Sequence, residues 1–234
     1  YGKNNYSTVL VGSSLSGALE VKKLFKEKYF NLFLPFTDAS TGIEVIRRSR
    51  KIPKRIFIEI NHIDRGIDSS LIQSIFNSPF YELRYFFPFL RTENKFFPNI
   101  VDRLKKPVDN KINKNKPSPK LYKALIKNAQ DEWSEIGDTD FLRCKLDIVK
   151  HAVAEFAAKG CSIFFYEMPM DSSLNNSPLL MYQRNYFAKL ASQNNYTFIG
   201  TDKTRTYQTG DGVHLLKDDA IIYCKYLVDE FSKK

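Results

Sequence analysis

Short apolar runs alternate with longer helix-like stretches along this chain, and this alternation constrains the fold more than any other feature. The apolar runs are "TVLV" at 8–11, "YFNLFL" at 29–34, "RIFIEIN" at 55–61, "CSIFFYEM" at 161–168 and "YTFIG" at 196–200. The helix-like stretches lie at about 41–50, 139–159, 178–193 and 215–232. Short strands separated by helices of this length indicate βαβ units and a parallel sheet covered on both faces. We therefore expect a three-layer α/β/α fold with about five parallel strands.

The segment 68–135 interrupts the alternation. It is helix-like in part and aromatic, and then becomes polar around "NKINKNKPSPK". An insertion of this size in an α/β domain is usually a lid or an accessory cap. Because 234 residues with 43% hydrophobic content can bury one sizeable core, we expect a single domain over 1–234 with a helical, basic and aromatic cap at about 68–135.

The formal net charge of +10 is concentrated in one part of the chain. Residues 91–127 hold eleven Lys or Arg against three acidic residues, a net charge of +8. Such a segment is either a solvated excursion or a surface for an anionic glycan or lipid, and no nucleic-acid motif accompanies it. If it binds substrate, the candidate contacts are Lys105, Lys106, Lys114 and Lys116.

The cysteines and the hydropathy narrow the class of protein. Cys144, Cys161 and Cys224 have no C-x-x-C spacing, which argues against a zinc site and leaves a single disulfide open. No apolar run approaches the roughly 18 residues of a membrane span, so the segment itself is expected to be soluble. The chain starts at Tyr1, and a signal peptide or membrane anchor upstream is compatible with that start.

Three serines follow the first apolar run directly. In "STVLVGSSLSGALE" at 7–20, Gly12 is followed by Ser13, Ser14 and Ser16. Serine at such a turn is commonly a helix N-cap, because its oxygen accepts an orphan backbone N–H. The alternative is that one of them is a nucleophile, since ligands of open α/β sheets bind beyond the carboxyl ends of the strands.

A second candidate segment, "TGDGVHLL", precedes the last helix-like stretch. It places Asp211 three residues before His214, at the sheet edge where Ser14 is expected. A neutral imidazole there can take the proton of a serine hydroxyl while the carboxylate orients the ring. His62 has no obvious carboxylate beside it, and His151 falls in the middle of a helix-like stretch.

A third candidate is Asn61, at the end of the run "IFIEIN". Its amide, together with the backbone N–H of Ser14, is expected to donate hydrogen bonds to a developing oxyanion. Ordinary turn chemistry is the alternative role of an asparagine at this position. A phosphate-binding loop is excluded, because Gly12 and Gly17 have its spacing but Ala18 stands where lysine is required.

Taken together, these three segments resemble the SGNH (GDSL) hydrolase superfamily. Its first block, G-D-S-x-S, aligns with Gly12-Ser13-Ser14-Leu15-Ser16; its third, G-x-N-D, with Glu59-Ile60-Asn61-His62; and its last, D-x-x-H, with Asp211-Gly212-Val213-His214. The resemblance covers the chain outside 68–135. It implies Ser14 as nucleophile, Asp211 and His214 as its partners, and no metal or organic cofactor.

The departures from the family pattern point to one branch of it. Ser13 replaces the aspartate of the first block, and "YEMP" at 166–169 is also similar to the "GSS" variants associated with cell-envelope polymer O-acylation. No glycine of the second block is evident in "NLFLPFTDAS", where backbone N–H groups near Phe36 to Ala39 are the available substitutes.

The resemblance therefore implies a serine-dependent O-acyltransferase or O-acetylesterase acting on an envelope glycan outside the cytoplasm. It implies an acyl ester donor and a glycan acceptor, and it allows a membrane-embedded acyltransferase as a partner. A cap that positions an acceptor and limits water favours transfer over hydrolysis. The alternative is a catalytically decayed protein of the same fold that binds or assembles polymers.

Overall fold

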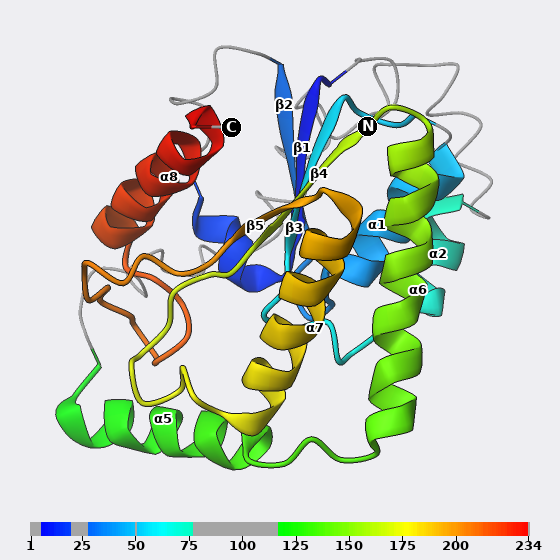
Figure 1. Cartoon of the computed structure of the whole chain (residues 1–234). Helices are drawn as coiled ribbons and strands as arrows, with labels where there is room; N and C mark the ends of the chain where they lie inside the picture. The colour runs from blue at the N-terminus through cyan, green and yellow to red at the C-terminus, as the bar shows by residue number, and fades with distance from the viewer. Residues whose placement is uncertain (1–5, 20–27, 50, 77–116, 234) are drawn as a thin grey trace, which may run out of the picture.

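A five-stranded, all-parallel sheet forms the centre of the molecule in the computed structural model (Figure 1). The structure describes residues 6–19, 28–49, 51–76 and 117–233. The strands are β1 (Thr8–Gly12), β2 (Tyr29–Phe33), β3 (Arg55–Glu59), β4 (Ser162–Tyr166) and β5 (Thr197–Ile199). They are ordered β2-β1-β3-β4-β5 across the sheet. The three-layer α/β/α fold predicted from the sequence is confirmed.

Helices cover both faces of this sheet. The short 3₁₀ helix η1 (Ser14–Ala18) and α8 (Lys217–Ser232) lie on one side (Figure 1). On the other side lie α1 (Ala39–Ser49), α2 (Ser69–Phe76), α6 (Thr139–Ala158) and α7 (Pro178–Asn194). The register explains this arrangement, because alternate strand residues face opposite layers. Phe57 and Phe164 contact Phe231 of α8, whereas Phe165 contacts Phe187 of α7.

The helix α5 (Pro119–Trp133) lies across the end of the molecule to which the strands point (Figure 1). Ser118 caps it by accepting a hydrogen bond from the N–H of Leu121, and Pro119 occupies its first turn, where a missing N–H costs nothing. The buried Trp133 anchors its far end. Thus α2 and α5 form the two described ends of the predicted cap, and residues 77–116 lie outside the described residues.

Four of the five strands are shorter than their apolar runs, and β3 and β4 each end two residues early. β3 ends at Glu59, two residues before Asn61, and β4 ends at Tyr166, two residues before Met168. Past these ends the Asn61 side chain bonds both backbone polar groups of Met168 and so takes over from the ladder. The carboxyl edge of the sheet is therefore held by a side chain as well as by strand pairing.

The remaining sequence expectations concern cysteines and membrane segments. Cys144 is exposed, Cys161 and Cys224 are buried, and all three are free thiols. No helix within the described ranges is long and apolar enough to cross a membrane.

Candidate active site

The turn after β1 places its serines on different faces of η1. Ser13 is the N-cap, and its Oγ accepts the N–H of Leu15 at 3.2 Å. Ser13 and Ser16 are buried, while Ser14 is only partly buried. Both interpretations of this serine cluster thus apply, because Ser13 caps the helix and Ser14 is left facing the carboxyl edge of the sheet.

The buried carboxylate of Glu59, at the end of β3, holds this turn by hydrogen bonds to two of its serines. Its Oε1 accepts the Ser13 hydroxyl at 2.6 Å and its Oε2 accepts the Ser13 N–H at 3.1 Å, while the Ser16 hydroxyl also donates to it. Ser16 Oγ in turn lies 2.6 Å from the hydroxyl of Tyr166. Burial raises the pKa of Glu59, and the hydrogen bonds from the two serines act against that rise. This role of Glu59 was not predicted from the sequence, where its only sign is a carboxylate at the end of an otherwise apolar run.

The turn is also packed too closely for a side chain at Gly12. A Cβ on Gly12 would lie 2.3 Å from Ser16 Oγ and 2.5 Å from Glu59 Oε2. Glycine at position 12 is therefore a packing requirement of the carboxylate network.

The segment before α8 is a tight turn built around one carboxylate. Asp211 Oδ1 accepts the backbone N–H groups of Val213 at 3.0 Å and of His214 at 2.7 Å. Its Oδ2 lies 2.6 Å from the Nδ1 of the His214 ring. The three-residue spacing lets one side chain both close the turn and orient the imidazole. Gly212 has φ +96°, a conformation that favours glycine, and a Cβ there would lie 2.9 Å from Ile126 of α5.

The structure brings Ser14, His214 and Asp211 together in that order. Ser14 Oγ lies 2.9 Å from His214 Nε2, across 200 residues of sequence. Burial alone would raise the pKa of Asp211, but hydrogen bonds from the ring and backbone of His214 outweigh burial and hold that pKa below its usual value. An ionised Asp211 requires the ring proton on Nδ1, which leaves Nε2 free to accept the Ser14 proton. This arrangement has the order of contacts found in serine hydrolases.

A cavity of about 580 Å³ opens over this group. Besides Ser14 and His214, its walls include Gly17 and Phe33 on one side and Leu125 of α5 on the other. The walls are mostly apolar, which suits an acyl chain or acetyl group more than a charged ligand. Pro117 and Leu125, at the described end of the segment predicted as a cap, therefore line the cavity that holds Ser14.

The prediction that Asn61 donates to an oxyanion is not supported by its position. Asn61 is buried, its Nδ2 donates to the Met168 carbonyl at 2.9 Å, and its Oδ1 accepts the Met168 N–H at 2.7 Å. The second N–H of the amide faces the sulfur of Met170 at 3.8 Å. The amide makes these hydrogen bonds because backbone polar groups in the loop after β4 lose their strand partners once the ladder ends. We therefore assign Asn61 a structural role.

Backbone groups are the remaining candidates for an oxyanion site. Ser14 N is the first amide of η1, where helical N–H groups have no partner within the helix. In the second-block region, Phe36 has φ +68°, so this turn has the backbone shape usually reserved for glycine. The Thr37 N–H is already used, since it donates to the Leu34 carbonyl at 3.3 Å.

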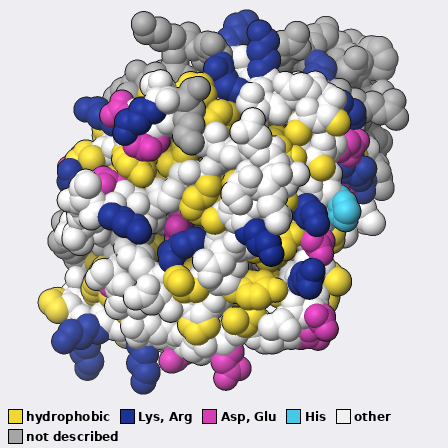
Figure 2. Space-filling model, viewed as in Figure 1, with side chains coloured by type: hydrophobic (Ala, Val, Ile, Leu, Met, Phe, Trp, Pro, Cys, Tyr) yellow, Lys and Arg dark blue, Asp and Glu magenta, His cyan; other side chains and the backbone are white. Residues whose placement is uncertain are grey.

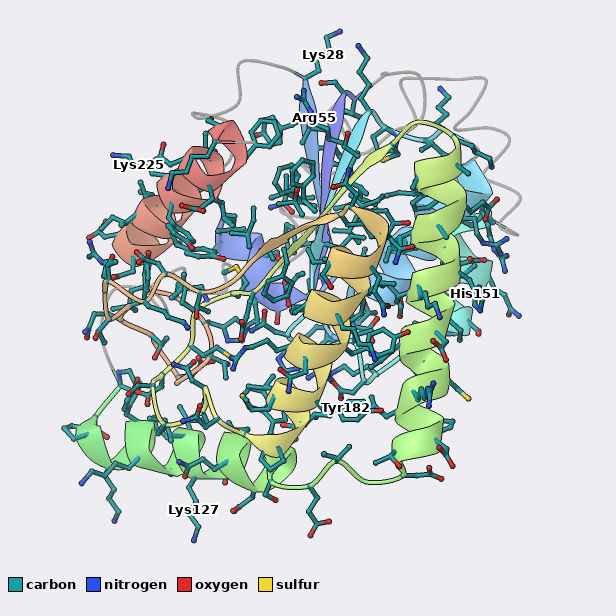
Figure 3. All side chains as sticks on the ribbon, in the orientation of Figure 1. Lys28, Arg55, Lys127, His151, Tyr182 and Lys225 are labelled. Atoms are coloured by element: carbon teal, nitrogen blue, oxygen red, sulfur yellow. The ribbon has the colours of Figure 1, made fainter. Side chains whose placement is uncertain are left out.

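The two other histidines lie outside this arrangement. His62 is buried against Trp133, with ring centroids 5.0 Å apart, and burial lowers its pKa to about 4. Its Nδ1 and the Trp133 Nε1 are buried without a hydrogen-bond partner in the described structure. His151 is exposed on α6, pointing away from the sheet (Figure 3).

The lysines predicted as polymer contacts fall in the segment between α2 and α5. Lys105, Lys106, Lys114 and Lys116 lie outside the described residues. Over the described surface, lysines and arginines are dispersed among hydrophobic and uncharged groups on the face shown in Figure 2. Lys127 of α5 extends outward from the body of the molecule (Figure 3).

Comparison with known proteins assigns the chain to no family. No protein-family model matches the chain, and a search of curated proteins finds no match. Among the described residues, no group of three or more His, Cys, Asp or Glu side chains is placed to hold a metal ion.

Proposed function

We propose that this protein is a serine-dependent acyltransferase or esterase of the SGNH type, with Ser14 as nucleophile. The observation that carries the proposal is the continuous contact from Ser14 Oγ to His214 Nε2 at 2.9 Å and from His214 Nδ1 to Asp211 Oδ2 at 2.6 Å. Segments far apart in sequence meet to form it, beside a cavity large enough for an ester.

The reaction follows from the protonation states. His214 Nε2 takes the proton of Ser14 as Oγ attacks the ester carbonyl, and the Asp211 carboxylate stabilises the imidazolium. The Ser14 N–H is the donor placed to stabilise the oxyanion, with the glycine-like turn at Phe36 as the second candidate. The protonated His214 then donates to the leaving oxygen. The acyl group of the resulting acyl-enzyme passes to water or to an acceptor hydroxyl.

The substrate class rests on the resemblance to envelope-polymer O-acylation proteins. That resemblance supports an envelope glycan as acceptor, a location outside the cytoplasm and a membrane-embedded acyltransferase as partner. The basic segment 91–127 supports an anionic polymer or lipid surface nearby.

One observation favours the alternative, a polymer-binding or assembly protein without catalysis. The side-chain amide of Asn61 is fully occupied by Met168 and Met170, so the site lacks the asparagine donor that the family pattern implies. A site with one donor fewer would lose about 10²- to 10³-fold in rate if nothing replaced that donor.

Labelling with a serine-directed fluorophosphonate separates the two functions. We expect one adduct on Ser14, located by peptide mass spectrometry, and none in the Ser14→Ala variant. Ser162→Ala, a substitution at an exposed serine at the start of β4, is the matched control and should label like the wild type. If folded wild-type protein stays unlabelled while a general esterase reacts, the catalytic function is wrong and the binding function takes its place.

A further inference from the structure

A second cavity, of about 330 Å³, lies beside the one that holds Ser14. Its walls come from the start of α5, from the loop after β4 and from residues 206–209. Pro117 lines both cavities, so the two cavities adjoin next to the N-terminus of α5. No residue role predicted from the sequence falls in the second cavity.

The segment 206–216 lines both cavities and forms a hydrogen-bonded turn. Its first half lines the second cavity and its second half carries Asp211 and His214. An isolated bridge pairs Thr209 with Leu215, the Gly210 N–H donates to the His214 carbonyl at 2.8 Å, and the Leu216 N–H donates to the Gln208 carbonyl at 2.9 Å. A ligand in the second cavity would therefore contact the same turn that positions the catalytic base.

The walls of the second cavity are rich in fixed polar groups. The Tyr122 hydroxyl donates to Asp171 Oδ2 at 2.9 Å and lies 2.7 Å from Thr209 Oγ1. The Asp171 backbone N–H donates to the Gly212 carbonyl at 2.7 Å, which ties this wall to the turn of the catalytic base. Ser172 and Gln208 add exposed polar side chains. By contrast, the cavity at Ser14 is walled mainly by apolar groups such as Phe33 and Leu125.

Asp171 supplies the charge of the described walls of the second cavity. Burial would raise the pKa of Asp171, but hydrogen bonds from Ser173 and Tyr122 outweigh burial and hold that pKa below its usual value. Among the described residues that line the cavity, Asp171 is the only charged one. A negative wall disfavours an anionic ligand, because like charges in a partly dehydrated site repel.

We propose that this second cavity is the acceptor subsite and that it takes an uncharged, hydroxyl-rich molecule of monosaccharide size. The inference rests on the proposed function and specifies it, since an acceptor held here stands next to the acyl group on Ser14. Its polar walls match hydroxyl groups, and Pro117 and Pro119 offer apolar surface to the ring. Negative charge on a polymer acceptor would have to lie outside this subsite.

The step at this subsite is a simple exchange of ester bonds. The acceptor oxygen attacks the acyl carbon, and its proton passes to His214 Nε2. The bond between the acyl carbon and Ser14 Oγ breaks, and the imidazolium returns the proton to Ser14 Oγ. The products are the acceptor ester and free enzyme, with no oxidant or further reactant.

The test compares two acceptors that differ at C6, where methyl glucoside has a primary alcohol and methyl glucuronide has a carboxylate in its place; the Asp171→Asn variant separates the effect of charge from that of the missing hydroxyl. Wild-type protein is acylated with p-nitrophenyl acetate in the presence of methyl glucoside or methyl glucuronide, and acetylated sugar and free acetate are quantified. We expect transfer to methyl glucoside to saturate with acceptor concentration and to exceed transfer to the glucuronide at least tenfold. Asp171→Asn should narrow that preference at least threefold.

A substitution that fills the cavity provides the second arm. Ser172→Trp should lower the ratio of transferred to hydrolysed acetyl groups at least tenfold. Gln193→Trp, on an exposed position of α7, is the matched control and should keep the wild-type ratio. A wild-type acceptor dependence that never saturates, or a Ser172→Trp ratio equal to that of the control, would overturn the subsite.

Failure of the proposed function gives a different result. If no acetyl-enzyme forms in a burst experiment, the catalytic role of Ser14 is refuted. The subsite is then tested by saturation-transfer NMR of methyl glucoside with the Ser14→Ala chain, which needs no chemistry. Signal that disappears with an added Ser172→Trp substitution, and persists with Gln193→Trp, supports the subsite, and absence of signal in Ser14→Ala refutes it.

Discussion

Replacing Asp211 by asparagine should remove catalysis while leaving the turn intact. The carboxylate accepts two backbone N–H groups at Oδ1 and the ring N–H at Oδ2. In Asp211→Asn, the amide oxygen must stay with the two backbone donors, because an NH₂ group cannot accept them. The NH₂ group then faces Nδ1 of His214 and forces the ring proton onto Nε2, where it blocks transfer from Ser14.

The size of the effect follows from this change of tautomer. In chymotrypsin-type serine proteases, a triad histidine held in the wrong tautomer by the same substitution costs about 10⁴-fold in kcat. Here the side chains of His214 and Asp211 are 44% and 35% exposed, so water can partly rescue the ring orientation. We therefore expect kcat to fall by about 10³- to 10⁴-fold, or about 4 to 5.5 kcal/mol of activation free energy.

The assay is the rate of acyl-enzyme formation with p-nitrophenyl acetate, measured with the thermal unfolding midpoint of each variant. Asp218→Asn, at an exposed acidic residue in the first turn of α8, is the control and should keep wild-type activity. A kcat of Asp211→Asn within tenfold of wild type, with Ser14→Ala inactive, would refute the reasoning. Asp211 would then only close the turn.

Three further predictions concern the frame around the site. In Gly12→Ala, the new Cβ would clash with Ser16 and Glu59. We expect the free energy of unfolding to fall by about 1–3 kcal/mol and kcat to fall about 10²-fold. Unchanged urea midpoints and rates would contradict this. Ser13→Ala removes the N-cap of η1 and a hydrogen-bond donor to Glu59. It should lower the free energy of unfolding, measured by urea titration, by about 1–2 kcal/mol. No change would mean that the hydroxyl is dispensable. Burial raises the pKa of Asp38 to about 6, so the folded chain holds a proton that the unfolded chain releases between about pH 4 and 6. Across that window Asp38 contributes a fall of about 3 kcal/mol in the free energy of unfolding as pH rises, whereas His62, whose pKa burial lowers to about 4, contributes a rise. Between about pH 4 and 6 the free energy of unfolding of Asp38→Asn should therefore change about 3 kcal/mol more in the upward direction than that of the wild type; equal pH slopes in urea titrations would exclude the Asp38 contribution.

The sequence predicted the fold because the three central strands, β1, β3 and β4, are buried on both faces. Such strands read as continuous apolar runs, and the helices between them are long enough to be recognised by length. Ser14, Asp211 and His214 could also be predicted from the sequence, because Ser14 directly follows the first strand and the other two precede the last helix. Their meeting within hydrogen-bond distance is a consequence of the parallel topology.

Asn61 and Glu59 show what the sequence could not predict. Whether an asparagine after a strand faces the site or the neighbouring loop depends on where the ladder ends, and β3 and β4 end two residues before their apolar runs do. Glu59 lies inside an apolar run, and only the tertiary contact with Ser13 and Ser16 shows why a carboxylate is tolerated there. The cavity at Asp171 depends on the packing of the start of α5 against two loops that are distant in sequence, and such packing has no local signal.

The geometry of η1 explains why three serines stand together in "GSSLS". A 3₁₀ helix has three residues per turn, so residues three apart lie one above the other. Ser13 and Ser16 therefore share the face that meets Glu59, and Ser14 faces another direction, toward His214. The residue above Ser14 is Gly17, where a Cβ would lie 3.0 Å from the Phe33 ring, and its lack of a side chain keeps the cavity at Ser14 open. Two of the three hydroxyls hold the turn through Glu59, so that the third is positioned beside His214.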